Sequence, residues 1–430
     1  MDAATYRDYV NILHEELVPA MGCTEPIAIA YAAAVARQTL GRPAQRMEVE
    51  ASGNIIKNVK SVFVPNTGGL RGIPAAAAAG MAAGDPALEL EVLSSIGEGE
   101  QAAIRQYLAD TPIAVKLADS PFIFDIAIRA WAGEDSALVR IVNYHTNIVR
   151  VERNGQVLKE VEAQAAAEEG LTDKSVLTVE GILEFAREAA LADVEDAVGR
   201  QVRYNTAIAQ EGLRGNYGAN IGKVLLATYG DDVKIRAKAM AAAGSDARMN
   251  GCGLPVVIVS GSGNQGLTAS LPVVEYAKEL GADWETTLRA VLVSDLITIH
   301  LKAEIGRLSA YCGAVSAGCG SGAGIAWLYG REKEPQALLK DVSHTIVNAL
   351  AVDSGIVCDG AKASCAAKIA SAVDAGLLGF YMYQNGQQFR GGDGIISKGV
   401  EETIRNIGLL ATQGMRETDR EILDIMTTRC

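Results

Sequence analysis

The sequence predicts an α+β fold, with N-terminal helices plus a mixed or antiparallel sheet domain, followed by a mainly α-helical domain with glycine-rich loops. Residues 46–160 alternate between apolar and polar side chains or are β-branched, as strands are. After about residue 175 the apolar residues follow the helical period. A chain of 430 residues is natural for two domains. We therefore predict an α+β domain over residues 1–165 and a helical domain over 166–430, with residues 161–175 as the boundary region.

Two helices are predicted over residues 4–39, separated by a loop at MGCTEP. Pro26 suits the first turn of the second helix. Cys23, Thr24 and Glu25 are then expected at a helix N-terminus, where backbone N–H groups and the helix dipole favour anions. A cysteine in that position has a lowered pKa, so a thiolate is expected at Cys23 near neutral pH.

Several segments of the sheet domain have strand character. Asn154-Gly155 lies between two of them and indicates a hairpin. Two Ala-rich helices, near residues 74–83 and 99–109, are expected to cross the sheet. The predicted strands lie in RMEVEASG, KSVFVP, LELEVL, PIAVKLA, FIFDIAIRAW, ALVRIVNYH and NIVRVERNGQVLKEVE.

Composition and charge exclude several functions. The net charge of −13 argues against a nucleic-acid partner, which needs a basic face. Early charged residues argue against a signal peptide, and no uninterrupted apolar stretch reaches the ~20 residues that span a bilayer. We expect a cytoplasmic protein with no membrane partner, whose seven cysteines form no structural disulfides.

Three cysteines stand beside glycines in the second half of the chain. Cys312 lies in LSAYCGAVSAGCG, and Cys358 and Cys365 lie in GIVCDGAKASC. An iron–sulfur cluster needs thiolates from separate segments and short loops that turn N–H groups towards sulfur. A continuous helix would separate Cys358 and Cys365 by about 10 Å, whereas Gly360 favours a loop followed by a helix. On spacing alone, small buried thiols are an equal interpretation.

Long blocks of the sequence resemble the L-cysteine desulfidase group of the iron–sulfur L-serine dehydratase alpha-chain family. These blocks are MGCTEPIAIAYA, GNIIKNV, HLKAEIGRLSAYCGAVSAGCGSGAGIAWLYG, GIVCDGAKASCAAKIASAVDAGLL and KGVEETIRNIGLLATQGMRETDREIL. The resemblance implies a [4Fe–4S] cluster held by Cys312, Cys358 and Cys365, with one iron left open. Cys319 is the alternative to Cys312. The chain departs from the serine dehydratases in the shorter spacing of its later cysteine pair and in GCTEP, and both departures favour the desulfidase branch.

The reaction implied by this resemblance is an oxygen-sensitive β-elimination that converts L-cysteine into pyruvate, ammonia and sulfide without pyridoxal phosphate. The open iron would act as a Lewis acid on the leaving sulfur. L-serine is the alternative substrate. A non-catalytic iron–sulfur redox sensor, and a zinc or cluster-free hydrolase with Cys23 as nucleophile, are the alternatives from other classes.

The remaining site residues follow from the needs of an amino-acid substrate. Cys23 is the predicted base, with a fourth-ligand role as the alternative. Thr24, Glu25, Asn54 and Asn264 are predicted to bind substrate; Glu25 would accept the ammonium, and Asn264 lies in a loop whose N–H groups suit a carboxylate.

Other polar residues are expected to be peripheral. His145 and His300 are expected to be satisfied, partly buried histidines, although either could orient substrate. Lys302, Glu304 and Arg307 are expected to form a set of charges on one helix face. Cys430 ends the chain either as an idle thiol or as a cap on the open iron. A homodimer is expected on base rates.

Overall fold

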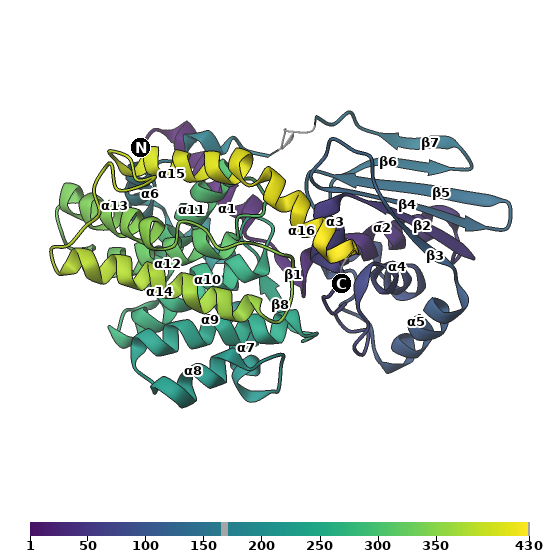
Figure 1. The fold of residues 1–430 in the computed structure, drawn as a ribbon, viewed down its shortest axis with the longest axis horizontal. Coiled ribbons are helices and arrows are strands. Elements are labelled where there is room, and N and C mark those ends of the chain that lie inside the picture. Colours follow the sequence, from purple (N-terminus) through teal and green to yellow (C-terminus); the bar gives the residue numbers. More distant parts are fainter. Residues whose placement is uncertain (165–170, 429–430) are drawn as a thin grey trace.

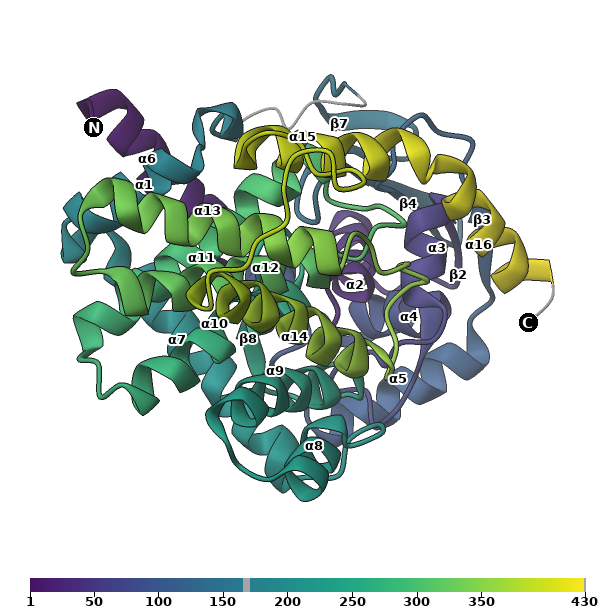
Figure 2. The same ribbon diagram turned by 60° about the vertical axis from the view of Figure 1, so that its left-hand side comes forward.

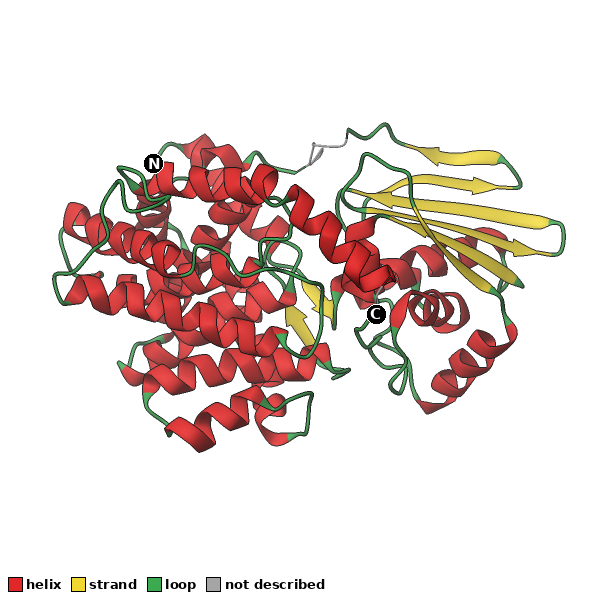
Figure 3. Cartoon of the chain, in the orientation of Figure 1, coloured by secondary structure: helices red, strands yellow, loops and turns green. Residues whose placement is uncertain are grey.

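The computed structural model describes residues 1–164 and 171–428, and it confirms the predicted α+β class. A sheet with helices on one face forms one end of the molecule, and a large helical body forms the other (Figures 1 and 3). The predicted boundary between residues 165 and 166 lies outside the described residues, so the division into two domains stays a prediction.

The described elements are listed here with their bounds. The strands are β1 (Pro19–Met21), β2 (Arg46–Ala51), β3 (Ile113–Leu117), β4 (Asp125–Ala132), β5 (Asp135–Val142), β6 (Ile148–Arg153), β7 (Gln156–Glu160) and β8 (Pro255–Val257). The helices are α1 (Ala3–Glu16), α2 (Thr24–Leu40), α3 (Gly53–Val59), α4 (Gly72–Ala83), α5 (Glu98–Asp110), α6 (Val179–Glu188), α7 (Leu191–Arg214), α8 (Ile221–Tyr229), α9 (Val233–Met249), α10 (Gly263–Glu279), α11 (Trp284–Ile305), α12 (Gly313–Gly330), α13 (Pro335–Val352), α14 (Cys365–Gln384), α15 (Val400–Leu409) and α16 (Arg416–Thr428). Short helical turns are η1 (Pro86–Glu91), η2 (Lys174–Val176) and η3 (Leu410–Gly414).

The main sheet has six strands in the order β3-β2-β4-β5-β6-β7. Only the β2–β3 pair is parallel, which agrees with the predicted mixed sheet. Val49, Ile128 and Val139 are opposite one another and buried, because α2 packs against β4, β5 and β6 on that face. Asn154 and Gly155 both have positive φ, so the predicted β6–β7 hairpin is confirmed.

Two of the predicted strands are wrong. LELEVL lies mostly in η1, because Asp85 caps a helical turn whose first residue is Pro86. KSVFVP makes only an isolated bridge between Phe63 and Arg71, and the chain turns at Asn66, which has φ 57°. The two predicted crossing helices correspond to α4 and α5, whereas α3 was not predicted.

The N-terminal segment packs against the helical body as well as the sheet. Helix α1 contacts α7, and β1 pairs antiparallel with β8. Because α2, which follows β1, packs on the sheet, the N-terminal segment connects the sheet to the helical body.

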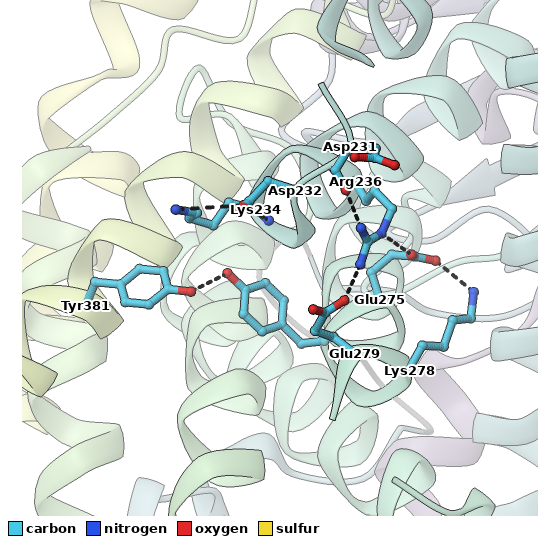
Figure 4. A network of polar contacts seen from close by, with 9 residues as sticks. Asp231, Asp232, Lys234, Arg236, Glu275, Lys278, Glu279 and Tyr381 are labelled. Carbon is cyan, nitrogen blue, oxygen red and sulfur yellow. Dashed lines mark hydrogen bonds and ion pairs between the residues drawn. The ribbon is translucent and has the colours of Figure 1, made fainter. Parts of the chain in front are cut away.

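Small residues let the helices of the body approach closely. A Cβ atom on Gly376 of α14 would lie 2.1 Å from the carbonyl oxygen of Gly318 on α12, so neither helix has room for a side chain there. Figure 2 shows α12 and α14 side by side with α13. The Tyr276 and Tyr381 hydroxyls are 2.8 Å apart and join α10 to α14. Figure 4 shows Tyr381 in the same region as the ion pairs of Arg236.

Helix α14 is the one described helix whose length and composition would allow it to cross a membrane. Its apolar window is 56% buried, and it packs against α9, α12 and α13. This is the packing of a core helix.

The C-terminal helix α16 returns from the helical body to the sheet end (Figure 1, yellow). It packs on α3, where Asp419 pairs with the buried ammonium of Lys57 and Lys60 donates to the carbonyl oxygen of Met426. Because α3 also contributes to the candidate site below, α16 supports that site from behind.

Candidate active site

The β1–β8 pair places the segment after β1 next to the loop after β8. Met21 is opposite Pro255, and Pro19 is opposite Val257. The Thr24 hydroxyl then donates to the carbonyl oxygen of Gly261 at 2.9 Å. The GCTEP and SGSGNQG segments are thereby held together although 237 residues separate Thr24 from Gly261.

The SGSGNQG loop is a tight turn that starts helix α10. Ser260 and Gly261 both have positive φ, and Val259 and Ser262 exchange two backbone hydrogen bonds across them. Helix α10 begins at Gly263, and no side chain caps it. The first N–H groups of the helix are therefore left for another acceptor.

A backbone bridge brings the first two predicted ligand cysteines together. Tyr311 and Val357 form an antiparallel bridge. The N–H of Cys358 donates to Ala310 at 2.7 Å, and the N–H of Cys312 donates to Ile356 at 2.9 Å. The sulfurs of Cys312 and Cys358 are close enough to share a hydrogen bond.

Cys365 is the first residue of α14, so the predicted loop followed by a helix is confirmed for the Cys358–Cys365 segment. Gly360, with φ 92°, permits the loop to turn against α3, where a Cβ atom would lie 2.3 Å from the carbonyl oxygen of Lys57. A side chain at this position would push the loop away from α3.

These segments enclose one cavity of about 100 Å³ between the two halves of the molecule. It is lined by all three predicted ligand cysteines together with Cys23, Glu25 and Asn264. Its other polar lining residues are Asn58, His145, Arg248, Ser260, Ser262, Gln265, Lys302, Arg307, Ser309 and Tyr311.

Cys23 is the N-cap residue of α2, as predicted, but its expected low pKa is wrong for this structure. Burial raises the Cys23 pKa well above its ordinary value, and the negative charge of Glu25 adds to the increase. The helix N-terminus and Arg248 do not outweigh these effects. Cys23 instead donates a hydrogen bond to Glu25 Oε2 at 3.0 Å.

Glu25 is the one carboxylate that lines the cavity, and it stays ionised. Burial raises its pKa, but positive charge at His145 and Arg248 and the hydrogen bond from Cys23 bring the pKa below the ordinary value. Burial lowers the pKa of His145 itself to about 4, so this histidine is neutral at pH 7. At that pH Arg248 and the Cys23 hydrogen bond are therefore the main influences that keep Glu25 charged.

The paired thiols differ in acidity. The hydrogen bond with Cys358, followed by burial, raises the pKa of Cys312. The same hydrogen bond lowers the pKa of Cys358, with help from the charge of Lys57. The thiolate form that a metal ligand needs is therefore favoured at Cys358.

The cavity also contains polar atoms that lack partners. Buried atoms without a hydrogen bond are Asn58 Oδ1, His145 Nε2, Arg248 Nε, Asn264 Oδ1, Gln265 Oε1 and Tyr311 OH. Buried polar groups are almost always hydrogen-bonded in native proteins. So many unsatisfied atoms around one space indicate that a polar ligand completes them.

Three residues from the sequence analysis are not brought to this cavity. Asn54 lies one helical turn before Asn58 on α3 and lines a neighbouring cavity of about 580 Å³ beside α16. The Thr24 hydroxyl donates to the carbonyl oxygen of Gly261 and also contacts Glu25 Oε2, so it is not directed at the cavity. Cys319 is buried within α12, and its sulfur points to the carbonyl oxygen of Ile346 at 3.7 Å. Cys430 lies outside the described residues.

Sequence reasoning missed Arg248 and Asn58 and misplaced Lys302 and Arg307. Lys302 is buried against the cavity, and Arg307 pairs with Glu16 at 2.7 Å, so neither belongs to a solvent-facing charged helix surface. Arg248 stands in the last turn of α9, a helix that carries several other charged side chains, so its own segment gave no signal of a role in the cavity. The expectation for His300 fits its 2.7 Å contact with Glu401.

Among the described residues, no three His, Cys, Asp or Glu side chains are grouped closely enough to hold a single metal ion. A four-iron cluster is wider than one ion, so its ligands lie further apart. Three cysteines on one cavity, from segments that each provide free N–H groups or a glycine turn, fit the donor set of such a cluster.

Comparison with known proteins gives consistent matches over nearly the whole chain. A family model described as serine dehydratase alpha chain matches residues 87–424, which include the three cysteines but not Cys23 or Glu25. A UPF0597 protein of Desulfitobacterium hafniense is 58% identical over 99% of this chain and 97% of the relative. UPF0597 proteins of Lachnoclostridium phytofermentans and Treponema denticola are 51% and 45% identical, over 98% and 99% of this chain and 99% of each relative.

Proposed function

Because this chain belongs to the family of serine dehydratase alpha chains, we propose that its cavity is the active site of a lyase that eliminates the β-substituent of L-cysteine. The observation that carries the proposal is the convergence of Cys23, Cys312, Cys358 and Cys365 on one cavity. The family suggests a lyase of amino-acid catabolism, and the choice of cysteine rests on the GCTEP segment.

Cys312, Cys358 and Cys365 would hold a [4Fe–4S] cluster, since they fit its donor set. When bound, such a cluster supplies an open iron that acts as a Lewis acid on the leaving sulfur. Lys302 is buried on the same wall with no ion-pair partner recorded among the described residues. Its ammonium would offset the negative charge that thiolate ligands bring there.

We assign Cys23 as the base that removes the Cα proton and Glu25 as the acceptor for the substrate ammonium. The negative charge of Glu25 raises the Cys23 pKa as long as no cation is bound to it. An ammonium bound to Glu25 would cancel that charge, so substrate binding itself would favour the thiolate. The backbone N–H of Asn264, at the uncapped start of α10, would help to bind the carboxylate, because the side-chain amide nitrogen donates to Met249 Sδ.

The elimination breaks the Cα–H and Cβ–S bonds and leaves sulfide and 2-aminoacrylate. This enamine tautomerises to an imine, which water hydrolyses to pyruvate and ammonia. The cavity is small and buried, so it would keep water away until the carbon–sulfur bond breaks.

The test is pyruvate release by protein that is purified and iron-reconstituted without oxygen and given L-cysteine and L-serine in parallel. We expect faster turnover of L-cysteine, sulfide equal to pyruvate, and loss of activity in air. Faster turnover of L-serine would place the chain with the serine dehydratases that name its family. Pyruvate from neither substrate would contradict the proposal, and turnover unaffected by air or iron chelators would favour a cluster-free reaction.

A homodimer in the cytoplasm completes the proposal. Light scattering on the purified protein tests the dimer.

A further inference from the structure

The cavity is lined by two groups of polar atoms of opposite character, one that suits an anion and one that suits a cation. Arg248 offers a cation and an unsatisfied donor, Nε, whereas Asn58 beside Glu25 offers an unsatisfied acceptor, Oδ1. A free α-amino acid carries the matching pair, a carboxylate and an ammonium. This inference rests on the proposed function and assigns two further substrate-binding residues to it.

Arg248 lies against the N-terminus of helix α10. A Cβ atom placed on Gly263, the first residue of that helix, would be 2.4 Å from Arg248 Nε. Arg248 is 3% exposed, and no carboxylate partner is recorded for it within residues 1–164 and 171–428. Arg248 acts on Glu25 through its charge but forms no ion pair with it. Burying a guanidinium without a directly bonded anion is costly, so a further anion is expected next to it.

The N-terminus of α10 supports the same ligand. Its N-cap, Ser262, makes no side-chain hydrogen bond to the helix, and the helix has 17 residues. Uncapped N–H groups and a guanidinium fork both suit a carboxylate. The two donors are independent, because one belongs to α9 and the other to α10.

The orientation of Asn58 is fixed by chemistry. Its amide nitrogen donates to Glu25 Oε1 at 2.9 Å, and an ionised carboxylate only accepts hydrogen bonds. The amide oxygen must therefore be the atom that is left unsatisfied in the cavity. A carboxylate and an amide oxygen side by side suit the three N–H groups of an ammonium.

We propose that Arg248 is the residue that, with the α10 N-terminus, binds the carboxylate of the amino-acid substrate, and that Asn58 joins Glu25 in binding its ammonium. Small molecules that carry only one of these ends would bind weakly. Peptides would be excluded, since a peptide bond removes one of the two charges.

Binding without turnover tests the proposal. L-alanine carries both ends but no leaving group, propionate carries only the carboxylate, and ethylamine carries only the ammonium. Their dissociation constants are measured by ligand-observed NMR or calorimetry on the cluster-loaded protein. We expect L-alanine to bind more tightly than either fragment by at least about tenfold, because one charged hydrogen bond contributes about that much.

Each variant should lose one end only. Arg248→Gln should weaken the binding of L-alanine and propionate by about 10- to 100-fold and leave the binding of ethylamine unchanged. Asn58→Ala should weaken the binding of L-alanine and ethylamine and leave the binding of propionate unchanged. Arg248→Lys keeps the charge but not the planar guanidinium group, so its affinity for L-alanine should lie between those of the wild-type protein and Arg248→Gln. Arg214→Gln, on an exposed arginine of α7, is the matched control.

Two results would overturn the proposal. One is equal loss of propionate and ethylamine in Arg248→Gln, which would mean that Arg248 serves the bound cofactor or the fold. The other is a wild-type protein that binds L-alanine no better than the fragments. Turnover is measured separately from binding. If no pyruvate forms but the binding pattern is as expected, the proposed reaction is wrong and this inference stands. If pyruvate forms and Arg248→Gln has the wild-type KM for L-cysteine, this inference is wrong and the proposed reaction stands.

Discussion

Glu25 connects the thiol of Cys23 to the amide of Asn58, so in the proposed reaction one carboxylate would influence both substrate binding and proton transfer. Both of its oxygens accept hydrogen bonds from protein groups, and each can accept another. This arrangement keeps the charge in place before an ammonium arrives. The Cys23–Glu25 pair is therefore a unit, and a change at Glu25 should affect KM and the pH profile together.

We expect Glu25→Gln to raise KM for L-cysteine by roughly 10- to 100-fold, the cost of losing one charged hydrogen bond. Removing the negative charge should also shift the alkaline rise of kcat/KM, which reports the free enzyme, to lower pH, because that charge raises the Cys23 pKa before substrate binds. Steady-state kinetics between pH 6 and 10 measures both effects. Glu304→Gln, an exposed carboxylate outside this cavity, is the control, and an unchanged KM in Glu25→Gln would remove the ammonium assignment.

His145 makes stability depend on pH. Its pKa falls from 6.5 to about 4 on folding, because burial disfavours the charged ring. Between these values the unfolded chain binds a proton that the folded chain does not, so stability falls as the pH drops from 6.5 towards 4. The loss between pH 7 and pH 5 should be about 2 kcal/mol.

Urea unfolding of cluster-free protein at the two pH values measures this loss. His145→Gln keeps a polar side chain without the titration, so its stability should change less over the same range. Equal pH dependence in the two proteins would show that His145 does not titrate as described.

At the scale of elements, helix α3 lies between the site and the C-terminal helix. Its Asn58 faces Glu25, its Lys57 carbonyl oxygen lies against Gly360, and its Lys57 ammonium pairs with Asp419 of α16. Lys57 is 2% exposed, so the pair is largely desolvated. Helix α16 therefore fixes the position of α3 against the loop that carries Cys358.

We expect Asp419→Asn to loosen α3, because it leaves the Lys57 charge buried without its partner. The cost should be about 3 kcal/mol, the low end for a broken buried pair, since Asp419 is partly accessible. Hydrogen exchange over residues 53–59 measures it. Glu417→Gln breaks an exposed pair with Arg420 and should change nothing; protection unaltered in Asp419→Asn would contradict a supporting role for α16.

At the scale of the whole molecule, periodicity and turn chemistry predicted the secondary-structure elements better than the long-range contacts between them. The β6–β7 hairpin followed from Asn154-Gly155, and the helices near residues 74 and 99 followed from local pattern. The β1–β8 pair joins strands of three residues more than 230 positions apart, and no local signal marks such a contact. Arg248 lines the cavity together with Cys23 and Glu25 from a distant part of the chain, so its place there could not be predicted from its own segment.

The same organisation predicts how the whole molecule responds to loading. Cys312, Cys358 and Cys365 come from the start of α12, a loop and the start of α14, so a bound cluster would cross-link three segments that otherwise depend on packing. A ligand that binds only the folded state raises stability by mass action. We expect anaerobic reconstitution to raise Tm by several degrees, with Cys312→Ser abolishing the increase and Cys319→Ser preserving it, because Cys319 lies outside the cavity. Differential scanning fluorimetry under argon measures the shift. An increase that survives in Cys312→Ser but not in Cys319→Ser would reassign the first ligand to Cys319, and no increase in wild-type protein would argue against a cluster at this cavity.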